Sequence, residues 1–161
     1  MKKLYKAPAL AGLALMAAFS TAATAQDNTK LDFPACTTKD GLTVEYIERT
    51  TSPLYRYTII SAGVDRRIID GRVRAAVIYD DWFLKSRPQK QRRFILEHEC
   101  AHHRLGHLEY SNVKKLNHKM ELEADCAAVQ ALQTKWNYSK DDIRAVMTLF
   151  ESESERETHP S

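Results

Sequence analysis

Residues 98–102 read His-Glu-Cys-Ala-His, inside the stretch FILEHECAHHRLGHL that covers positions 94–108. Residues four apart share one face of a helix, so the imidazoles of His98 and His102 can reach the same metal ion. With His98 as the origin of a helical wheel, His102 falls at about 40° and Glu99 at about 100°. Glu99 therefore borders the ligand face without ligating, which is where a general base can take a proton from a metal-bound water.

A helix is expected over residues 88–108, because Pro88 suits a helix start and no breaker follows before Gly106. Four apolar side chains fall beside the ligand face of this helix: Phe94, Ala101, Leu105 and Leu108. The ligand face is therefore expected to turn toward the core. This context favours a metal site over a pair of satisfied surface histidines.

A third ligand is available in Glu121, which opens the sequence ELEAD 19 residues after His102. A second long helix is expected over residues 113–135, and two helices joined by a short loop pack antiparallel. Glu121 would then face the two histidines, and three protein ligands plus a water form a catalytic zinc site. Asp125 shares the face of Glu121 and can accept the free N–H of a ligating imidazole. Glu123 lies about 200° away on the wheel and is expected to be solvated.

Other side chains near the motif are weaker candidates. His118 lies three residues before Glu121 and could donate a hydrogen bond to an oxyanion, although an exposed helical histidine is an equal alternative. Tyr110 is a second candidate donor. His103 and His107 fall at about 140° and 180° on the wheel, away from the metal, so His107 is expected to be structural or exposed.

The part of the chain before the motif is rich in β-branched and aromatic residues. Three segments are expected to form strands: Leu42–Arg49, Leu54–Ser61 and Arg72–Tyr79. The first two are expected to form a hairpin around Thr50–Pro53, and Gly63–Gly71 is expected to be a turn region. Residues 75–79 could form an edge that pairs with an extended substrate, but a plain core strand is the favoured interpretation. Antiparallel strands followed by helices indicate an α+β fold.

Two capping signals mark shorter helices. Asp80 can cap a short helix that ends near Leu84. Ser139 and Asp142 resemble a capping box that opens a helix over residues 141–150.

The net charge of +3 belongs to the first 25 residues. This segment has three lysines, an apolar run and an Ala-Thr-Ala cleavage site, which is typical of a secretory signal peptide. The rest of the chain carries 21 basic and 21 acidic residues, so overall charge gives no case for a nucleic-acid partner. We expect an exported protein, periplasmic or secreted, with no stable membrane anchor after signal cleavage. Export also allows disulfides to persist.

Three cysteines remain in the exported chain: Cys36, Cys100 and Cys126. An odd number leaves one free thiol or an intermolecular bond. Cys100 falls at about 200° on its wheel, nearly opposite the metal, so a bond to Cys126 across the two helices is awkward. A bond from Cys36 to either partner is preferred, and a buried free Cys100 is the alternative.

The sequences HECAHHRLGH and ELEAD resemble the gluzincin zinc metallopeptidases. The similarity covers about residues 90–150 and is greatest to the family of CAAX prenyl endopeptidases and the bacterial heat-shock protease HtpX. It implies that His98, His102 and Glu121 bind zinc, that Glu99 is the base and that Asp125 supports the site. The membrane helices of that family are lacking, so prenylated substrates are not implied.

The segment before the motif, VIYDDWFLKSRP, together with QRRFILEHE, also resembles the ImmA/IrrE-type metallopeptidases, which cleave regulators in the cytoplasm. Asp125 follows the first family, because the second usually has Asn there. The signal peptide also argues against a cytoplasmic role.

These observations divide the chain into four expected parts: a signal peptide (1–25), an irregular arm (26–40), a zincin-like domain (41–150) and a disordered acidic tail (151–161). The favoured function is a zinc endopeptidase acting on polypeptides. A cell-envelope zinc amidase and an inactive zinc-binding interaction module remain alternatives. The domain is small for a substrate cleft, so an unknown partner chain could complete it.

Overall fold

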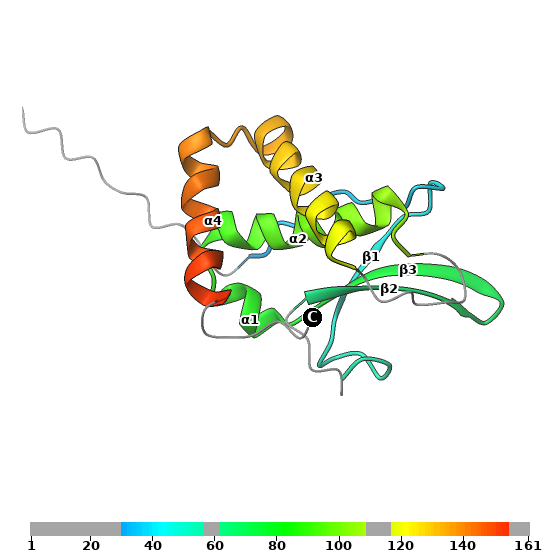
Figure 1. Cartoon of the computed structure of the whole chain (residues 1–161). Coiled ribbons are helices and arrows are strands. Elements are labelled where there is room, and N and C mark those ends of the chain that lie inside the picture. The colour runs from blue at the N-terminus through cyan, green and yellow to red at the C-terminus, as the bar shows by residue number, and fades with distance from the viewer. Residues whose placement is uncertain (1–29, 57–61, 109–116, 155–161) are drawn as a thin grey trace, which may run out of the picture.

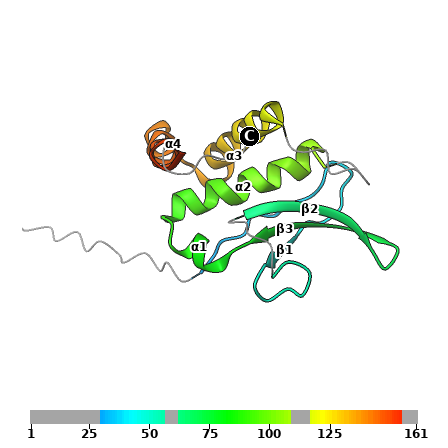
Figure 2. The ribbon, with the colours of Figure 1, turned by 60° about the horizontal axis from the view of Figure 1, so that its bottom comes forward.

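The computed structural model describes residues 30–56, 62–108 and 117–154. It has a mixed α+β architecture, as expected, with strands preceding helices along the chain (Figure 1). The elements are β1 (Glu45–Glu48), β2 (Ala62–Ile69), β3 (Arg72–Tyr79), α1 (Asp81–Lys85), α2 (Gln89–Leu105), α3 (His118–Trp136) and α4 (Lys140–Ser154). Figure 2 shows α2 between the sheet and α3, and α2 contacts β2, β3, α3 and α4.

Helix α2 carries the His-Glu-Cys-Ala-His motif through the centre of the molecule. It begins after Pro88 and ends before Gly106, which has a φ of 76° in the left-handed region. Glycine adopts this conformation without steric cost, and it is the usual end of a helix. A Cβ at Gly106 would also lie 2.8 Å from Cδ of Lys39. The helix was expected to end at Leu108, but it ends three residues earlier, at Leu105.

The sheet has the order β1-β3-β2, and its pairing differs from the expected one. β2 pairs antiparallel with β3, but β1 pairs parallel with β3, so the expectation of antiparallel strands throughout was wrong. The hairpin turns at Asp70-Gly71, with φ values of 50° and 72°. Two successive residues with positive φ match the right-handed twist of the flanking strands, which is why Asp-Gly favours this turn.

The expected positions of the second strand and its turns were also wrong. The segment Gly63–Gly71 is mostly strand β2, whereas Leu54–Arg56 lies in a turn. Residues 57–61 of the expected strand lie outside the described residues. The Asp70-Gly71 pair was a stronger turn signal than Thr50–Pro53, because it supplies both positive φ angles.

Strand β3 is the central strand of the described sheet. Its residues 75–78 are all buried, so the core-strand interpretation is correct and the edge-strand alternative is wrong. The outer strands are β1 and β2.

Two hydrophobic clusters bury opposite sides of α2. The cluster on the sheet side comprises Leu31, Cys36, Val44, Ala75, Val77, Leu84, Ile95, Leu96 and Cys100. The cluster on the helical side comprises Phe94, Ala128, Leu132 and Val146. Of the apolar side chains expected beside the ligand face, Leu105 alone is exposed. Burial on both sides leaves α2 little freedom to shift.

The irregular arm is tied to α2 at successive points along its length. Arg93 donates to Asp32 at 2.9 Å, Cys36 forms a disulfide with Cys100, and the backbone N–H of Lys39 donates to the carbonyl of His103 at 3.0 Å. Of the two disulfide pairings left open by the sequence, the structure contains Cys36–Cys100. Cys126 is a free, exposed thiol.

The helix starts follow their capping residues. Asp80 accepts the N–H of Phe83 at the start of α1, as expected. The N–H of Ser139 donates to the Asp142 carboxylate at 2.9 Å, and the N–H of Asp142 donates to the Ser139 hydroxyl at 3.1 Å, which confirms the capping box. Asn117 caps α3 through the N–H of Met120.

Several expectations fall wholly or partly beyond the described residues. The signal segment 1–25, residues 26–29 of the arm, the helical turn expected over 113–116 and residues 155–161 lie outside them. Helix α4 continues to Ser154, so the first four residues of the expected disordered tail are helical. None of the described helices combines the length and apolarity needed to cross a bilayer.

The first prediction concerns the disulfide, which closes a loop with a sequence separation of 64. Reduction, or the double substitution Cys36→Ala with Cys100→Ala, should lower the free energy of unfolding by about 2–4 kcal/mol, because the unfolded chain gains entropy. Urea denaturation with and without reductant measures this. Cys126→Ala should change the value by less than about 0.5 kcal/mol, since its thiol is exposed and unbonded. An unchanged transition after reduction would contradict the prediction.

Candidate metal centre

Three side chains from two helices converge on one point. Nε2 of His98 and Nε2 of His102 lie 3.1 Å apart at the middle of α2. The Oε2 atom of Glu121, from the first turn of α3, lies 3.2 Å from the first nitrogen and 3.6 Å from the second. The contact between α2 and α3 thus brings the three expected ligands together.

The spacing of these three atoms fits the ligand shell of a small divalent ion. In a tetrahedral site with bonds of about 2.0–2.1 Å, neighbouring ligand atoms lie about 3.3 Å apart. The three observed distances scatter around that value. His98, His102 and Glu121 could therefore hold a metal ion and leave one tetrahedral position open.

Asp125 fixes the ring of His98. Its Oδ1 atom lies 2.8 Å from Nδ1 of His98, one turn after Glu121 on α3. A carboxylate here accepts the proton on Nδ1, so the lone pair of His98 is on Nε2, which faces the other two ligands. The structure places Asp125 where the sequence predicted it.

His107 and Glu123 lie behind His102. His107 is buried, in agreement with the structural alternative, and Glu123 is exposed, as expected, but the wheel did not place either of them next to a candidate ligand. Nδ1 of His107 is 2.9 Å from Nδ1 of His102, and Nε2 of His107 is 3.2 Å from Oε2 of Glu123. The helical wheel failed because Gly106 ends the helix before His107. The backbone N–H of His107 then bonds the carbonyl of His102 at 3.0 Å. Recognising Gly106 as the helix end would have removed His107 from the wheel.

Glu99 lies next to the cluster and is half-buried. Burial raises the pKa of Glu99 to about 7; the charge of His98 lowers it and that of Glu121 raises it further. A divalent ion beside the carboxylate would lower this pKa again, since opposite charge favours ionisation. A carboxylate of this kind can accept a proton and release it near neutral pH.

The two ligand imidazoles differ in their affinity for protons. Burial disfavours the charged form of His98, but the hydrogen bond to Asp125 and the nearby carboxylates give His98 a net raised pKa. Burial and the charge of His98 lower the pKa of His102 to about 3. Without a metal, the proton in this cluster therefore belongs to His98, and a metal ion must displace it.

The remaining candidates lie apart from the cluster. His118 is the first residue of α3 and is exposed, and it is not a member of the described ligand group. Its proposed role toward an oxyanion stays a prediction. Tyr110 lies outside the described residues. Nε2 of His103 contacts the carbonyl of Ala76 on β3 at 3.0 Å, so His103 joins α2 to the sheet.

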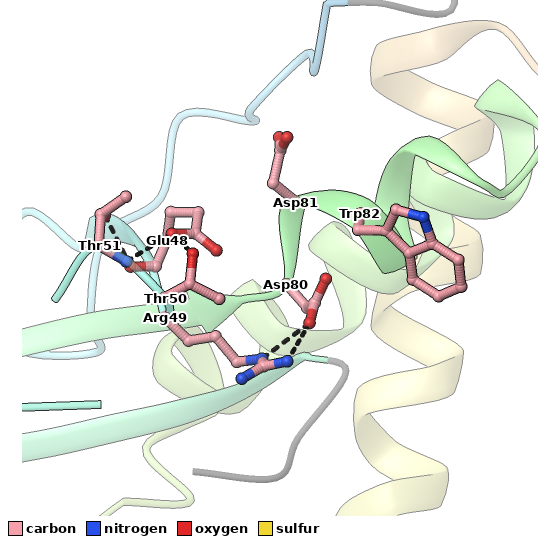
Figure 3. A pocket seen from close by; sticks show the side chains of 7 residues that line it. All are labelled: Glu48, Arg49, Thr50, Thr51, Asp80, Asp81 and Trp82. Atoms are coloured by element: carbon pink, nitrogen blue, oxygen red, sulfur yellow. Dashed lines mark hydrogen bonds and ion pairs between the residues drawn. The ribbon is translucent and has the colours of Figure 1, made fainter. Parts of the chain in front are cut away.

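A hollow apart from this cluster lies where β1 and β3 end and α1 begins (Figure 3). Its carboxylates are already paired. Nε of Arg49 donates to Asp80 at 2.8 Å, the N–H of Thr51 donates to Glu48 at 2.7 Å, and Asp81 pairs with Lys85 at 2.7 Å. Trp82 projects from its rim and is exposed. Among the described residues, the convergent group of histidine and carboxylate side chains therefore lies between α2 and α3 and not in this hollow.

Comparison of the chain with protein-family models, with curated proteins and with solved structures found no significant match.

The second prediction is that metal stabilises the native protein through the α2–α3 cluster. Zinc at about 100 times its dissociation constant should raise the free energy of unfolding by about 2.7 kcal/mol, because it binds the native state alone. Thermal unfolding with zinc and with chelator measures the shift. The shift should shrink as the pH falls, since zinc competes with the proton on His98.

Glu121→Gln should remove most of this stabilisation, whereas Glu45→Gln on β1 should retain it. Equal zinc-dependent shifts in both variants would place the bound metal elsewhere.

Proposed function

We propose that the chain is an exported zinc metalloendopeptidase of the gluzincin type. The observation that carries the proposal is the convergence of His98 Nε2, His102 Nε2 and Glu121 Oε2, with Glu99 beside them. The resemblance of HECAHHRLGH and ELEAD to gluzincins supports the same assignment. The Ala-Thr-Ala cleavage site supports export.

Zinc is proposed because of the donor set. Two imidazole nitrogens and one carboxylate oxygen, with an open fourth position, are typical of catalytic zinc in peptidases. Magnesium and calcium prefer shells of oxygen atoms. When bound, zinc would supply Lewis-acid polarisation of the scissile carbonyl and a lowered pKa for the attacking water.

The chain's own residues perform the proton transfers and hold the site. Glu99 takes a proton from the attacking water and later gives it to the leaving amine. Asp125 holds His98 in the tautomer that presents Nε2. His118 is proposed as a hydrogen-bond donor to the oxyanion, from one turn before Glu121.

A polypeptide substrate is supported by the sheet. Among the described residues β2 pairs with β3 alone, and β2 also contacts α2, which carries the motif. The outer edge of β2 therefore offers backbone groups to an extended peptide. Prenylated substrates are not proposed, since the resemblance covers about residues 90–150 and does not include the membrane helices of that family.

The third prediction tests catalysis directly. Glu99→Gln should lower peptide hydrolysis at least about 100-fold, because the amide cannot accept the proton. Zinc content should stay at the wild-type level, because Glu99 is not a ligand. The mature protein is assayed on casein and on unstructured peptides, with metal content measured in the same samples. Glu45→Gln serves as the matched control.

The outcomes separate the alternatives. Equal hydrolysis by wild type and Glu99→Gln would overturn the assigned base. Zinc binding with no hydrolysis by either protein would favour a binding module. Cleavage of cell-wall peptide amides but not of polypeptides would favour an envelope amidase.

A further inference from the structure

We propose that His107 and Glu123 form a positioning pair for the zinc ligand His102. The pair sets which nitrogen of His102 carries the proton and therefore which nitrogen faces the metal. This inference rests on the proposed zinc site and extends it to two residues outside the ligand motif. Neither residue touches the ligand point itself.

The position of each ring proton determines the direction of the hydrogen bonds from His102 to His107 and from His107 to Glu123. Nε2 of His102 belongs to the ligand cluster, so it must offer a lone pair, and the ring proton must be on Nδ1. The contact between Nδ1 of His102 and Nδ1 of His107 needs one donor and one acceptor. Nδ1 of His107 must therefore accept, which leaves the proton of His107 on Nε2. That Nε2–H donates to Oε2 of Glu123, because a carboxylate oxygen is an acceptor.

Burial makes the metal site depend on the direction of these hydrogen bonds. The side chain of His102 is 1% exposed and that of His107 is 6% exposed. Water is therefore excluded from the contact between the two Nδ1 atoms, and the proton on His102 depends on His107 as its acceptor. The Glu123 side chain is 46% exposed, so the chain of hydrogen bonds ends at solvent.

Backbone geometry holds His107 against the residue it orients. The left-handed Gly106 reverses the chain, and the N–H of His107 bonds the carbonyl of His102. The two imidazole rings meet edge to face at an interplanar angle of 68°. Lys119, one turn before Glu123 on α3, lies 3.7 Å from the Glu123 carboxylate.

The two ligand histidines are thus supported by different groups. His98 contacts a carboxylate directly through Asp125, whereas His102 reaches its carboxylate through a second imidazole. Both arrangements place a hydrogen-bond acceptor behind the ligating ring. The pair explains why a buried histidine follows Gly106, the residue that ends α2, and why Glu123 lies next to it.

Zinc affinity of the metal-free protein, measured by competition with a chromophoric chelator, tests the pair. His107→Leu removes the acceptor and should weaken zinc binding about 10–100-fold. His107→Asn places an amide oxygen near the position of Nδ1 and should recover most of that loss. Glu123→Gln retains an acceptor for Nε2–H and should bind zinc nearly as well as wild type, whereas Glu123→Leu should bind less tightly.

Two further measurements separate positioning from a merely structural role. Circular dichroism of each metal-free variant reports whether it is folded. Long-range ¹H–¹⁵N NMR spectra of the zinc-loaded wild-type protein should show protons on Nδ1 of His102 and on Nε2 of His107. A structural role does not predict the rescue by Asn.

Equal zinc affinity of folded His107→Leu and wild type would overturn the pair while leaving the proposed function intact. A proton on Nδ1 of His107 in the zinc-loaded protein would also overturn it. If wild type takes up no zinc, the proposed function fails and this inference fails with it.

Discussion

The structure depends on one constraint: two imidazoles one helical turn apart must aim the same nitrogen at one point. A surface helix rarely meets this requirement, because its side chains and its axis are free to move. Here α2 is held by the sheet on one side and by α3 and α4 on the other (Figure 2). The hydrophobic clusters on its two sides therefore serve the polar site that lies between α2 and α3.

The carboxylates near the candidate metal centre differ in what surrounds them, according to their position on the helices. Glu121 enters the ligand point, Asp125 lies one turn further along α3, and Glu99 borders the site from α2. Glu97, two residues before Glu99, is fully buried on another side of α2 and accepts from Trp136. Carboxylates thus have different environments, which are set by their positions around the helices and by the groups packed against each of them.

Local sequence spacing predicted the features that one or two helical turns determine. The phases of His98, Glu121 and Asp125 on their helices sufficed to predict their convergence, because helix geometry is regular. Strand pairing depends on contacts between distant segments, and the parallel pairing of β1 with β3 has no local signal. The contact between His107 and His102 was missed because a wheel cannot describe residues beyond a helix end. The turn between β2 and β3 and the end of α2 did have local signals, because Asp70, Gly71 and Gly106 adopt positive φ angles there, which Gly adopts readily.

The position of Cys100 inside the motif has a further consequence. Cys100 lies between His98 and His102 in sequence, and its bond to Cys36 attaches the arm to the side of α2 that faces away from the ligand point. A covalent attachment on this side resists rotation of the helix about its own axis, which packing alone resists less strongly. Any such rotation would move the imidazoles of both His98 and His102 away from the point where they converge with Glu121. The disulfide thus helps to fix the rotation of α2 about its axis, and with it the direction of the His98 and His102 side chains, as well as adding to the stability of the fold.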